Sequence, residues 1–175
     1  MTKRMRGIGL AVAVALIVSS RLSAPLTAAT AAVCDPNPKP ANLNFTLKDM
    51  HGRPVTLASY KGKVILLDFW ATWCGPCKLE IPGFARLESR YGRRGLVVLG
   101  VSTDDPVRKL PPFAREFKMN YPVLVGLGQQ GFKDAYGPLW AIPTTFVIGR
   151  NGMICRKHVG ISSMAEFERE IKALL

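Results

Sequence analysis

Two cysteines that enclose a Gly-Pro pair, in the order Cys74-Gly75-Pro76-Cys77, constrain this chain more than any other feature. The residues before them, 64–70, form a nearly continuous apolar run that predicts a buried central strand. The residues after them predict a helix from about position 76 to position 91. The pair therefore lies at a strand–helix junction, where Cys74 caps the helix and Cys77 occupies its first turn, within disulfide distance.

This position determines the chemistry that we expect of the pair. Backbone N–H groups and the dipole at a helix N-terminus stabilise an anion, which lowers a thiol pKa and favours the thiolate. We expect Cys74 to attack a disulfide of a partner protein, and Cys77, turned inward, to resolve the mixed disulfide. A redox-active Cys74–Cys77 disulfide needs no further cofactor.

Three other uses of a cysteine pair fit the sequence less well. A structural zinc site needs two more ligands, but the chain has no second C-x-x-C, and His51 and His158 are isolated. Covalent haem attachment needs a histidine directly after the second cysteine, where Lys78 stands. A purely structural disulfide is rare at a strand–helix junction that follows two tryptophans. We therefore expect no bound metal.

The remaining pattern predicts one α/β domain. The run 96–101 is apolar apart from Gly100, which argues for a second buried strand that pairs in parallel through a helix crossover. Within the helix at 76–91, Pro82 is expected to cause a kink, and Gly92 is expected to close the helix. Further strands are expected at 121–125, 144–148 and 153–157, further helices at 111–117, 132–136 and 163–175, and an extra N-terminal β-hairpin at 45–47 and 55–57. The expected architecture is a mixed central sheet flanked by helices.

The N-terminal segment has the features of a targeting sequence. Basic residues precede an apolar run at 8–18, which Arg21 cuts well short of the roughly 20 residues that a membrane-spanning helix needs. Ala29-Thr30-Ala31 fits a signal cleavage pattern. We assign residues 1–33 to a signal peptide or an N-terminal membrane anchor, 34–43 to a proline-rich leader and 44–175 to the folded domain. Either assignment places the domain in an oxidising compartment, the periplasm or the outer face of the cell membrane.

The chain is basic, with 24 Lys and Arg against 12 Asp and Glu and a formal net charge of +12. The basic residues are scattered, and no Lys/Arg run with interleaved aromatic residues occurs. We therefore expect a solvated basic surface and no nucleic-acid binding.

The segment 64–77, VILLDFWATWCGPC, resembles the active-site region of the thioredoxin superfamily, and within it that of the exported TlpA/ResA-like reductases. The resemblance runs from about residue 45 to residue 175 and includes Glu80, Pro82, Gly100-Val101-Ser102 and Ala141-Ile142-Pro143-Thr144-Thr145-Phe146. It implies a thioredoxin-like fold. It also implies that Pro143 is a cis proline facing the cysteines, and that Ile142 and Pro143 form a wall along which a substrate backbone pairs. Without the resemblance, a trans proline at a strand edge is the simpler interpretation.

Two acidic residues near the cysteines each have a structural and a functional interpretation. Asp68 lies inside the apolar strand, so it either turns to solvent or lies beneath Cys77 with a raised pKa, as the general base for resolution. The resemblance to thioredoxin favours the second, although thioredoxin pairs this acid with a lysine on the next strand, and the run 96–101 contains none. Glu80 follows Cys77 by one helical turn and is either a solvated carboxylate or a residue that tunes the thiol pKa.

The resemblance also indicates a function. Gly75-Pro76 matches thioredoxin, a strongly reducing protein, so we expect a monomeric reductase of protein disulfides, with Trp73 in contact with the partner. The expected substrates are apocytochrome c or the cysteine pair of a copper-site protein, in cytochrome c or cytochrome oxidase maturation. A reducing pair in an oxidising compartment implies a membrane electron donor of the DsbD/CcdA kind.

Two other functions remain open at this point. The first is a peroxiredoxin-type peroxidase, although its P-x-x-x-T-x-x-C signature is missing before Cys74. The second is a Sco-like copper-binding chaperone. That class uses a C-x-x-x-C spacing and a distant histidine, for which His158 is a weak candidate.

The two remaining cysteines are Cys34, at the start of the leader, and Cys155, on the last expected strand. An exported protein seldom keeps exposed thiols free. In one interpretation they form a structural disulfide that ties the leader to the domain. In the other, Cys155 is a small core residue and Cys34 is removed, lipidated or free, although the bulky Val33 argues against lipidation.

Overall fold

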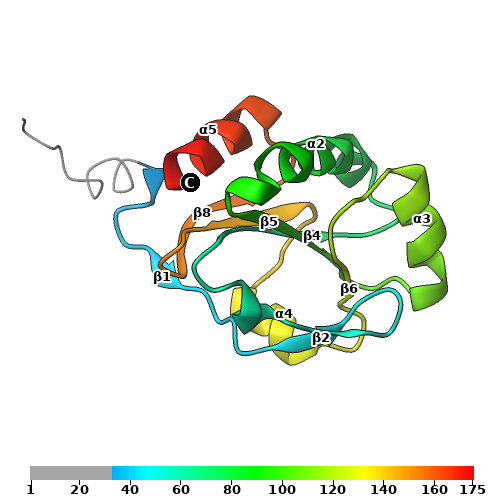
Figure 1. Cartoon of the computed structure of the whole chain (residues 1–175). Helices are drawn as coiled ribbons and strands as arrows, with labels where there is room; N and C mark the ends of the chain where they lie inside the picture. Colours follow the sequence, from blue (N-terminus) through cyan, green and yellow to red (C-terminus); the bar gives the residue numbers. More distant parts are fainter. Residues whose placement is uncertain (1–32) are drawn as a thin grey trace, which may run out of the picture.

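The computed structural model describes residues 33–175, and the signal segment expected at 1–33 lies, apart from Val33, outside them. The main sheet has six strands in the order β1-β8-β7-β4-β5-β6 (Figure 1). These strands are β1 (Lys39–Pro40), β4 (Val64–Trp70), β5 (Leu96–Ser102), β6 (Val123–Val125), β7 (Thr144–Ile148) and β8 (Met153–Val159). The helices of the described part are α2 (Gly75–Tyr91), α3 (Leu110–Glu116), α4 (Gln130–Tyr136) and α5 (Met164–Leu174). A second sheet pairs β2 (Thr46–Lys48) with β3 (Pro54–Thr56).

The centre of the main sheet is β4, which is buried at every residue. β4 pairs in parallel with β5, from Val64↔Leu96 to Trp70↔Ser102, and antiparallel with β7. A strand covered on both faces has no polar side, which explains the apolar run before the cysteines. The predicted mixed sheet, with a parallel pair joined by a helix, is confirmed.

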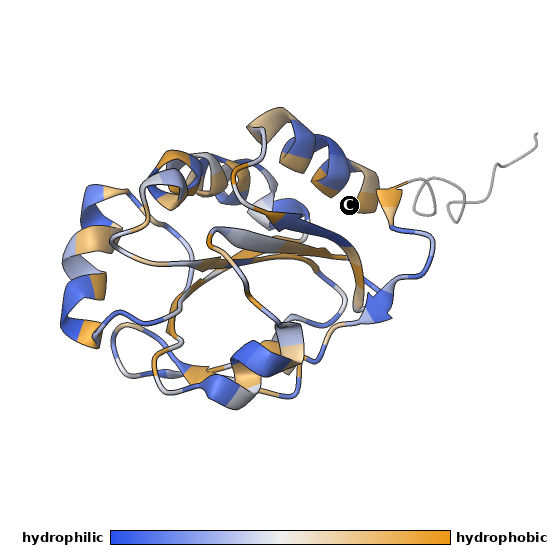
Figure 2. Ribbon diagram, turned by 180° about the vertical axis from the view of Figure 1, so that it is seen from behind, coloured by the Kyte–Doolittle hydropathy of each residue, from blue (hydrophilic) through white to orange (hydrophobic). Residues whose placement is uncertain are grey.

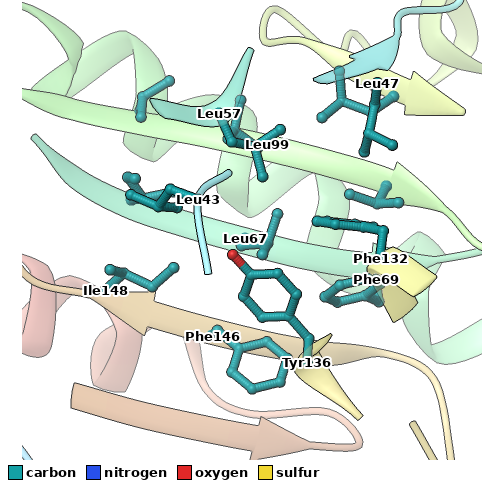
Figure 3. Close-up of a cluster of buried hydrophobic side chains, with 14 residues drawn as sticks. Leu43, Leu47, Leu57, Leu67, Phe69, Leu99, Phe132, Tyr136, Phe146 and Ile148 are labelled. Carbon is teal, nitrogen blue, oxygen red and sulfur yellow. The ribbon is translucent and has the colours of Figure 1, made fainter. Parts of the chain in front are cut away.

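One face of the sheet packs on α4. Successive side chains of a strand point to opposite faces, and the odd-numbered residues of β4 point to this one. Phe69 contacts Phe132 and Tyr136 of α4, with ring centroids 5.7 and 5.8 Å away, and Phe146 of β7 completes the aromatic cluster (Figure 3). Figure 1 shows α4 and β2 together on this side of the sheet.

The opposite face packs on α2, α3 and α5. Leu66 lies in a cluster with Phe84 of α2 and Phe167 of α5, while Trp70 packs with Cys77 and with residues of α3. Figure 1 shows α2 and α5 side by side over this face, and Figure 2 shows hydrophobic residues along the strands between the two layers. The even-numbered residues of β4 therefore point toward the helix that carries the cysteines.

Both ends of α2 lie where the sequence predicts them. Cys74 is the N-cap, as predicted, and the helix is continuous through Pro82. The C-terminal prediction is confirmed as well, because α2 ends at Tyr91 and Gly92 is its C-cap, with a right-handed φ of −54°, before a short 3-10 turn. The residue with left-handed φ is Gly95, at +105°, where an added Cβ would also lie 2.8 Å from the Arg150 guanidinium.

The leader forms part of the folded structure. β1 pairs antiparallel with β8, a disulfide joins Cys34 to Cys155, and the Asp35 N–H donates to the Cys155 carbonyl at 2.9 Å. β1 has only two residues, both exposed, so no hydrophobic alternation marks it in the sequence. None of the helices within residues 33–175 has the length and apolar character that crossing a membrane requires.

Candidate active site

The Cys74–Cys77 pair forms a disulfide at the N-terminus of α2. Cys74 ends the loop after β4, and its Sγ accepts a hydrogen bond from the Cys77 N–H at 3.2 Å. Cys74 is 3% exposed and Cys77 is 1% exposed, whereas Gly75 and Pro76 are exposed. Because a helix N-terminal N–H points at the Cys74 sulfur, this sulfur is the one that the helix stabilises as a thiolate.

The loop that carries Cys74 is held by the neighbouring strand end. Asp105, which is buried, accepts hydrogen bonds from the Thr72 N–H at 2.7 Å, from the Thr72 hydroxyl at 2.5 Å and from the Ser102 hydroxyl at 2.7 Å. The Trp73 indole N–H donates to Asp104 at 3.2 Å. Since β4 and β5 are parallel, their carboxyl ends lie together, and the loop after β5 fixes the loop before the cysteines.

Asp68 lies on the face of the sheet that carries α2. It has the same orientation as Leu66 and Trp70, and Trp70 packs against Cys77. Burial raises the pKa of the Asp68 carboxyl to about 8, the hydroxyl of Thr145 donates to it at 3.0 Å and lowers the pKa, and the charge of Glu80 raises it. Asp68 is 1% exposed, so the structure rules out the interpretation in which it turns to solvent.

Glu80 is buried as well, although its spacing alone favours a solvated carboxylate. It is 2% exposed, and its Oε1 accepts a hydrogen bond from the Ser162 N–H at 2.7 Å. Its Oε2 is buried without a hydrogen-bond partner. Burial raises the pKa of Glu80, while the Ser162 N–H and the charge of His158 lower it. Two buried carboxyls with raised pKa values thus lie on the α2 side of the sheet, and Glu80 is in the helix that begins at the cysteine pair.

Ile142 and a pocket lie next to the cysteines. The Ile142–Pro143 peptide bond is cis, and Ile142 packs against the cluster that contains Cys74 and Cys77. A pocket of about 640 Å³ opens beside Ile142, and Trp73 and Trp140 line it. The two indoles are 62% and 86% exposed, so this is an apolar surface open to solvent next to the disulfide.

The second disulfide lies away from this site. Cys34 and Cys155 pack with Phe167 and other residues of the cluster beneath α5, whereas Cys74 and Cys77 belong to the cluster at the N-terminal end of α2. The structure therefore separates the chain's four cysteines into two pairs. Within residues 33–175, no group of three or more His, Cys, Asp and Glu side chains is arranged to hold a metal ion.

A family model covers the segment that contains this site. The model of the AhpC/TSA family matches residues 39–157, which contain both cysteines of the pair and the Ile142–Pro143 peptide bond. The chain belongs to the AhpC/TSA family.

Relatives narrow the family to thiol–disulfide oxidoreductases. The thiol-disulfide oxidoreductase ResA of Geobacillus kaustophilus is 33% identical over 133 residues, which are 75% of this chain and 74% of that protein. The crystal structure of a thiol:disulfide interchange protein of the thioredoxin family from Chlorobium tepidum has a TM-score of 0.72 and 30% identity, covering 81% of this chain and 99% of that one. StoA from Bacillus subtilis, at 22% identity, shares the fold with a TM-score of 0.61, covering 75% and 98% of the two chains.

These matches confirm the thioredoxin-like fold and the ResA-like resemblance, and the AhpC/TSA member described here is a thiol–disulfide oxidoreductase. They do not favour the peroxidase or the copper chaperone, because the relatives are named for thiol–disulfide chemistry.

Sequence reasoning missed several residues of the site in this AhpC/TSA member. Asp105, Ser162 and Trp140 lie in loops, and Glu170 lies on α5, so no local pattern connects them with the cysteines. Only Asp105 could have been predicted, because it follows the second of two parallel strands and polar residues at such strand ends meet at one sheet edge. Ser162, Glu170 and Trp140 lie near the site only because α5 and the loop before β7 pack there.

Proposed function

We propose that the protein is an exported reductase of protein disulfides, with Cys74 as the nucleophile and Cys77 as the resolving thiol. The observation that supports this most directly is the Cys77 N–H aimed at the Cys74 sulfur at the start of α2. The Gly75-Pro76 pair between the cysteines, shared with reducing thioredoxin, supports the direction of electron flow.

The reaction balances over two displacements. The Cys74 thiolate attacks one sulfur of the substrate disulfide, a mixed disulfide forms, and the other substrate sulfur leaves as a thiolate that takes up a proton. Cys77 then loses its proton and attacks the Cys74 sulfur, which releases the second substrate thiol. The substrate gains two electrons and two protons, and the protein is left with the Cys74–Cys77 disulfide. A membrane dithiol donor of the DsbD/CcdA kind restores the reduced pair.

In this proposal Asp68 is the general base that takes the proton of Cys77. Asp68 points to the same sheet face as Trp70, two residues further along β4, and Trp70 shares a buried cluster with Cys77, which supports this role. A carboxyl with a pKa of about 8 is a stronger base than an ordinary aspartate, so proton transfer from a thiol to it is less uphill. Glu80 tunes this carboxyl, because its charge raises the pKa of Asp68.

Asp68→Asn is expected to slow resolution roughly a hundredfold at pH 8 and above, because a positioned base contributes about that factor or more. The attack by Cys74 is expected to stay close to the wild-type rate. A symmetrical aromatic disulfide separates the two steps, since each one releases a coloured thiolate. In the wild type, the second phase should accelerate as pH rises through the pKa of Asp68, and this rise should be absent in the variant. Equal second phases in both proteins would leave Asp68 with a structural role only; Glu116→Gln, on the exposed end of α3, is the control.

The same variant is expected to be more stable than the wild type at pH 8. The folded pKa of Asp68, about 8, lies above the value of roughly 3.9 in an unfolded chain. The unfolded chain therefore binds fewer protons between these values, and the wild type loses stability as pH rises through that window. Asparagine has no proton to lose, so the gap between the urea midpoints of variant and wild type should widen from pH 4 to pH 8. A constant gap would contradict the assigned pKa.

The proposed substrate surface is the wall at Ile142 and Pro143 together with Trp73 and Trp140. Exposed indoles beside a redox disulfide suit contact with a partially unfolded polypeptide, which presents both backbone and apolar side chains. An apocytochrome c, whose haem-binding Cys-x-x-Cys-His motif becomes oxidised before haem attachment, has these properties. The cysteine pair of a copper-site protein is the second substrate that we propose.

Trapping with defined peptides tests the proposed function. Reduced Cys77→Ser protein is expected to form a one-to-one mixed disulfide with an oxidised Cys-x-x-Cys-His peptide, detected by its intact mass. Cys74→Ser is the matched control and should form none. A peptide with an oxidised Cys-x-x-x-Cys pair, offered in competition, ranks the two substrate classes. Failure of Cys77→Ser to capture either peptide, while it still reacts with a small aromatic disulfide, would contradict a protein-disulfide reductase.

A further inference from the structure

A row of residues crosses the sheet beneath α2 and α5. Gly100 of β5 lies opposite Asp68 of β4, Asp68 lies opposite Thr145 of β7, and Thr145 lies opposite His158 of β8. Directly opposed residues point to the same face of a sheet. Asp68 is thus separated from His158 only by Thr145, whose hydroxyl donates to Asp68 at 3.0 Å.

His158 connects this row to both helices. Its Nε2 lies 2.9 Å from Oε2 of Glu170 on α5, and its Nδ1 lies 3.1 Å from the hydroxyl of Ser162. The N–H of the same Ser162 donates to Glu80 of α2 at 2.7 Å. The imidazole is 11% exposed and packs on Phe167, with ring centroids 4.6 Å apart. His158 therefore fixes the residue that holds Glu80.

The charges around His158 are mostly acidic. Glu170 of α5 contacts it, Glu80 of α2 is near enough for its charge to act, and Asp68 of β4 lies on the far side of Thr145 in the row. Arg156, next to it on the same strand, places its Nε 3.8 Å from Glu170, but its guanidinium also pairs with Asp35 of the leader. Tyr121, beside β6, also faces Asp68, whose charge contributes to a pKa for this phenol well above the usual value.

Within residues 33–175, no basic side chain stands opposite Asp68 on β5. The position directly opposite on β5 is Gly100, and the indole of Trp70 and the ring of Tyr121 fill the space beside it. On the β7–β8 side of the row, His158 is a basic group that connects to Glu80 through Ser162. Its charge lowers the pKa of Glu80, and the charge of Glu80 in turn raises the pKa of Asp68.

We propose that His158 is a positioning residue of the thiol–disulfide site, which holds Glu80 through Ser162 and balances the charge of the buried carboxyls beside the cysteines. This inference rests on the proposed role of Glu80 in thiol chemistry. The hydrogen bonds of His158 go to Ser162 and Glu170 and not to a cysteine. His158 therefore acts on Glu80, and the charge of Glu80 acts on Asp68. Protonated His158 favours the ionised form of Glu80, and its loss returns Glu80 to the protonated form over a wider pH range.

The test follows the Glu80 carboxyl directly, in oxidised protein labelled with ¹³C at the glutamate carboxyls, by NMR across a pH titration. Glu80→Gln identifies the Glu80 signal by its disappearance. In His158→Gln the midpoint of that signal is expected to move to higher pH. In His51→Gln, which removes the only other histidine from an exposed turn, it is expected to stay in place. Resolution of a mixed disulfide at pH 6 should slow by roughly three- to tenfold in His158→Gln, the size of one lost hydrogen-bonded contact.

The outcomes separate this inference from the proposed function. An unchanged Glu80 midpoint in a folded His158→Gln protein overturns the inference, even if that variant is less stable. If Glu80→Gln attacks and resolves at wild-type rates, Glu80 has no role in the thiol chemistry, and the inference about His158 fails as well. If His158→Gln does not fold, Ser162→Ala takes its place, since it deletes the hydroxyl that contacts His158 and keeps the N–H that Glu80 accepts. The same upward movement is expected there, and its absence overturns the inference.

Discussion

Cys74→Ser is expected to lose disulfide reduction by roughly a thousandfold or more, the scale of losing a nucleophile from an active site. Cys77→Ser is expected to keep the first displacement and to stop at the mixed disulfide. The reason for the difference is the geometry at the start of α2, where the Cys77 N–H stabilises the Cys74 sulfur and Cys77 itself lies inside the first turn. Backbone amides remain in place when Cys77 becomes serine, so the stabilisation of the Cys74 thiolate survives.

The aromatic disulfide assay reports this contrast directly. The wild type should release two equivalents of coloured thiolate, Cys77→Ser one, and Cys74→Ser none on the same timescale. Circular dichroism of each reduced variant confirms that the fold is retained. A first phase that persists in Cys74→Ser and vanishes in Cys77→Ser would assign the two thiols the opposite way.

Loss of the disulfide between the leader and β8 is the second large effect that we expect. Cys34 and Cys155 are 121 residues apart, and closing a loop of that size stabilises a protein by at most about 4–5 kcal/mol in the chain-entropy model. Cys34→Ser should therefore lower the free energy of unfolding by about 2–4 kcal/mol in urea titrations. It leaves Cys155 in the core, so the loss is due to the cross-link and not to a cavity. Disulfide reduction by Cys74 should continue, because this bridge lies beneath α5 and away from the site.

Thiol counting checks the same bridge without a substitution. Mild reduction should expose two thiols from the Cys74–Cys77 pair, and unfolding should expose no more. A maleimide that labels Cys34 or Cys155 in the untreated protein would show that the bridge does not form in solution. A change of less than about 0.5 kcal/mol on Cys34→Ser, within the range of ordinary surface substitutions, would show that it does not stabilise the fold.

Local patterns were sufficient to predict the part of the fold that carries the cysteines. The apolar run of β4, the cysteines and the amphipathic face of α2 are adjacent in sequence, so the strand–helix junction and the N-cap at Cys74 follow from short-range rules. β1 could not be found in this way, because two exposed residues have no periodicity and pair only through the return of the leader to β8.

The site shows the same division between local and long-range information. Burial of Asp68 was foreseeable, since it interrupts an apolar strand, but burial of Glu80 was not. Glu80 is buried because α5 and the loop at Ser162 pack over α2. The residues within one helical turn of Glu80 show no pattern that predicts this contact. His158 and Glu170 are twelve residues apart and meet only because β8 and α5 pack on each other. Buried polar networks of this kind join residues that are far apart in the sequence, so local patterns do not predict them.

The reduction potential of the Cys74–Cys77 pair determines whether the protein reduces or oxidises its substrates. It is obtained by equilibrating the protein with thiol–disulfide buffers of known potential and quantifying the dithiol and disulfide forms by alkylation and mass. A reductase with a Gly-Pro pair between its cysteines should titrate on the thioredoxin side of the range, near about −270 mV. A potential close to that of the oxidant DsbA, about −120 mV, would make the protein a donor of disulfides and would contradict the proposed direction of electron flow.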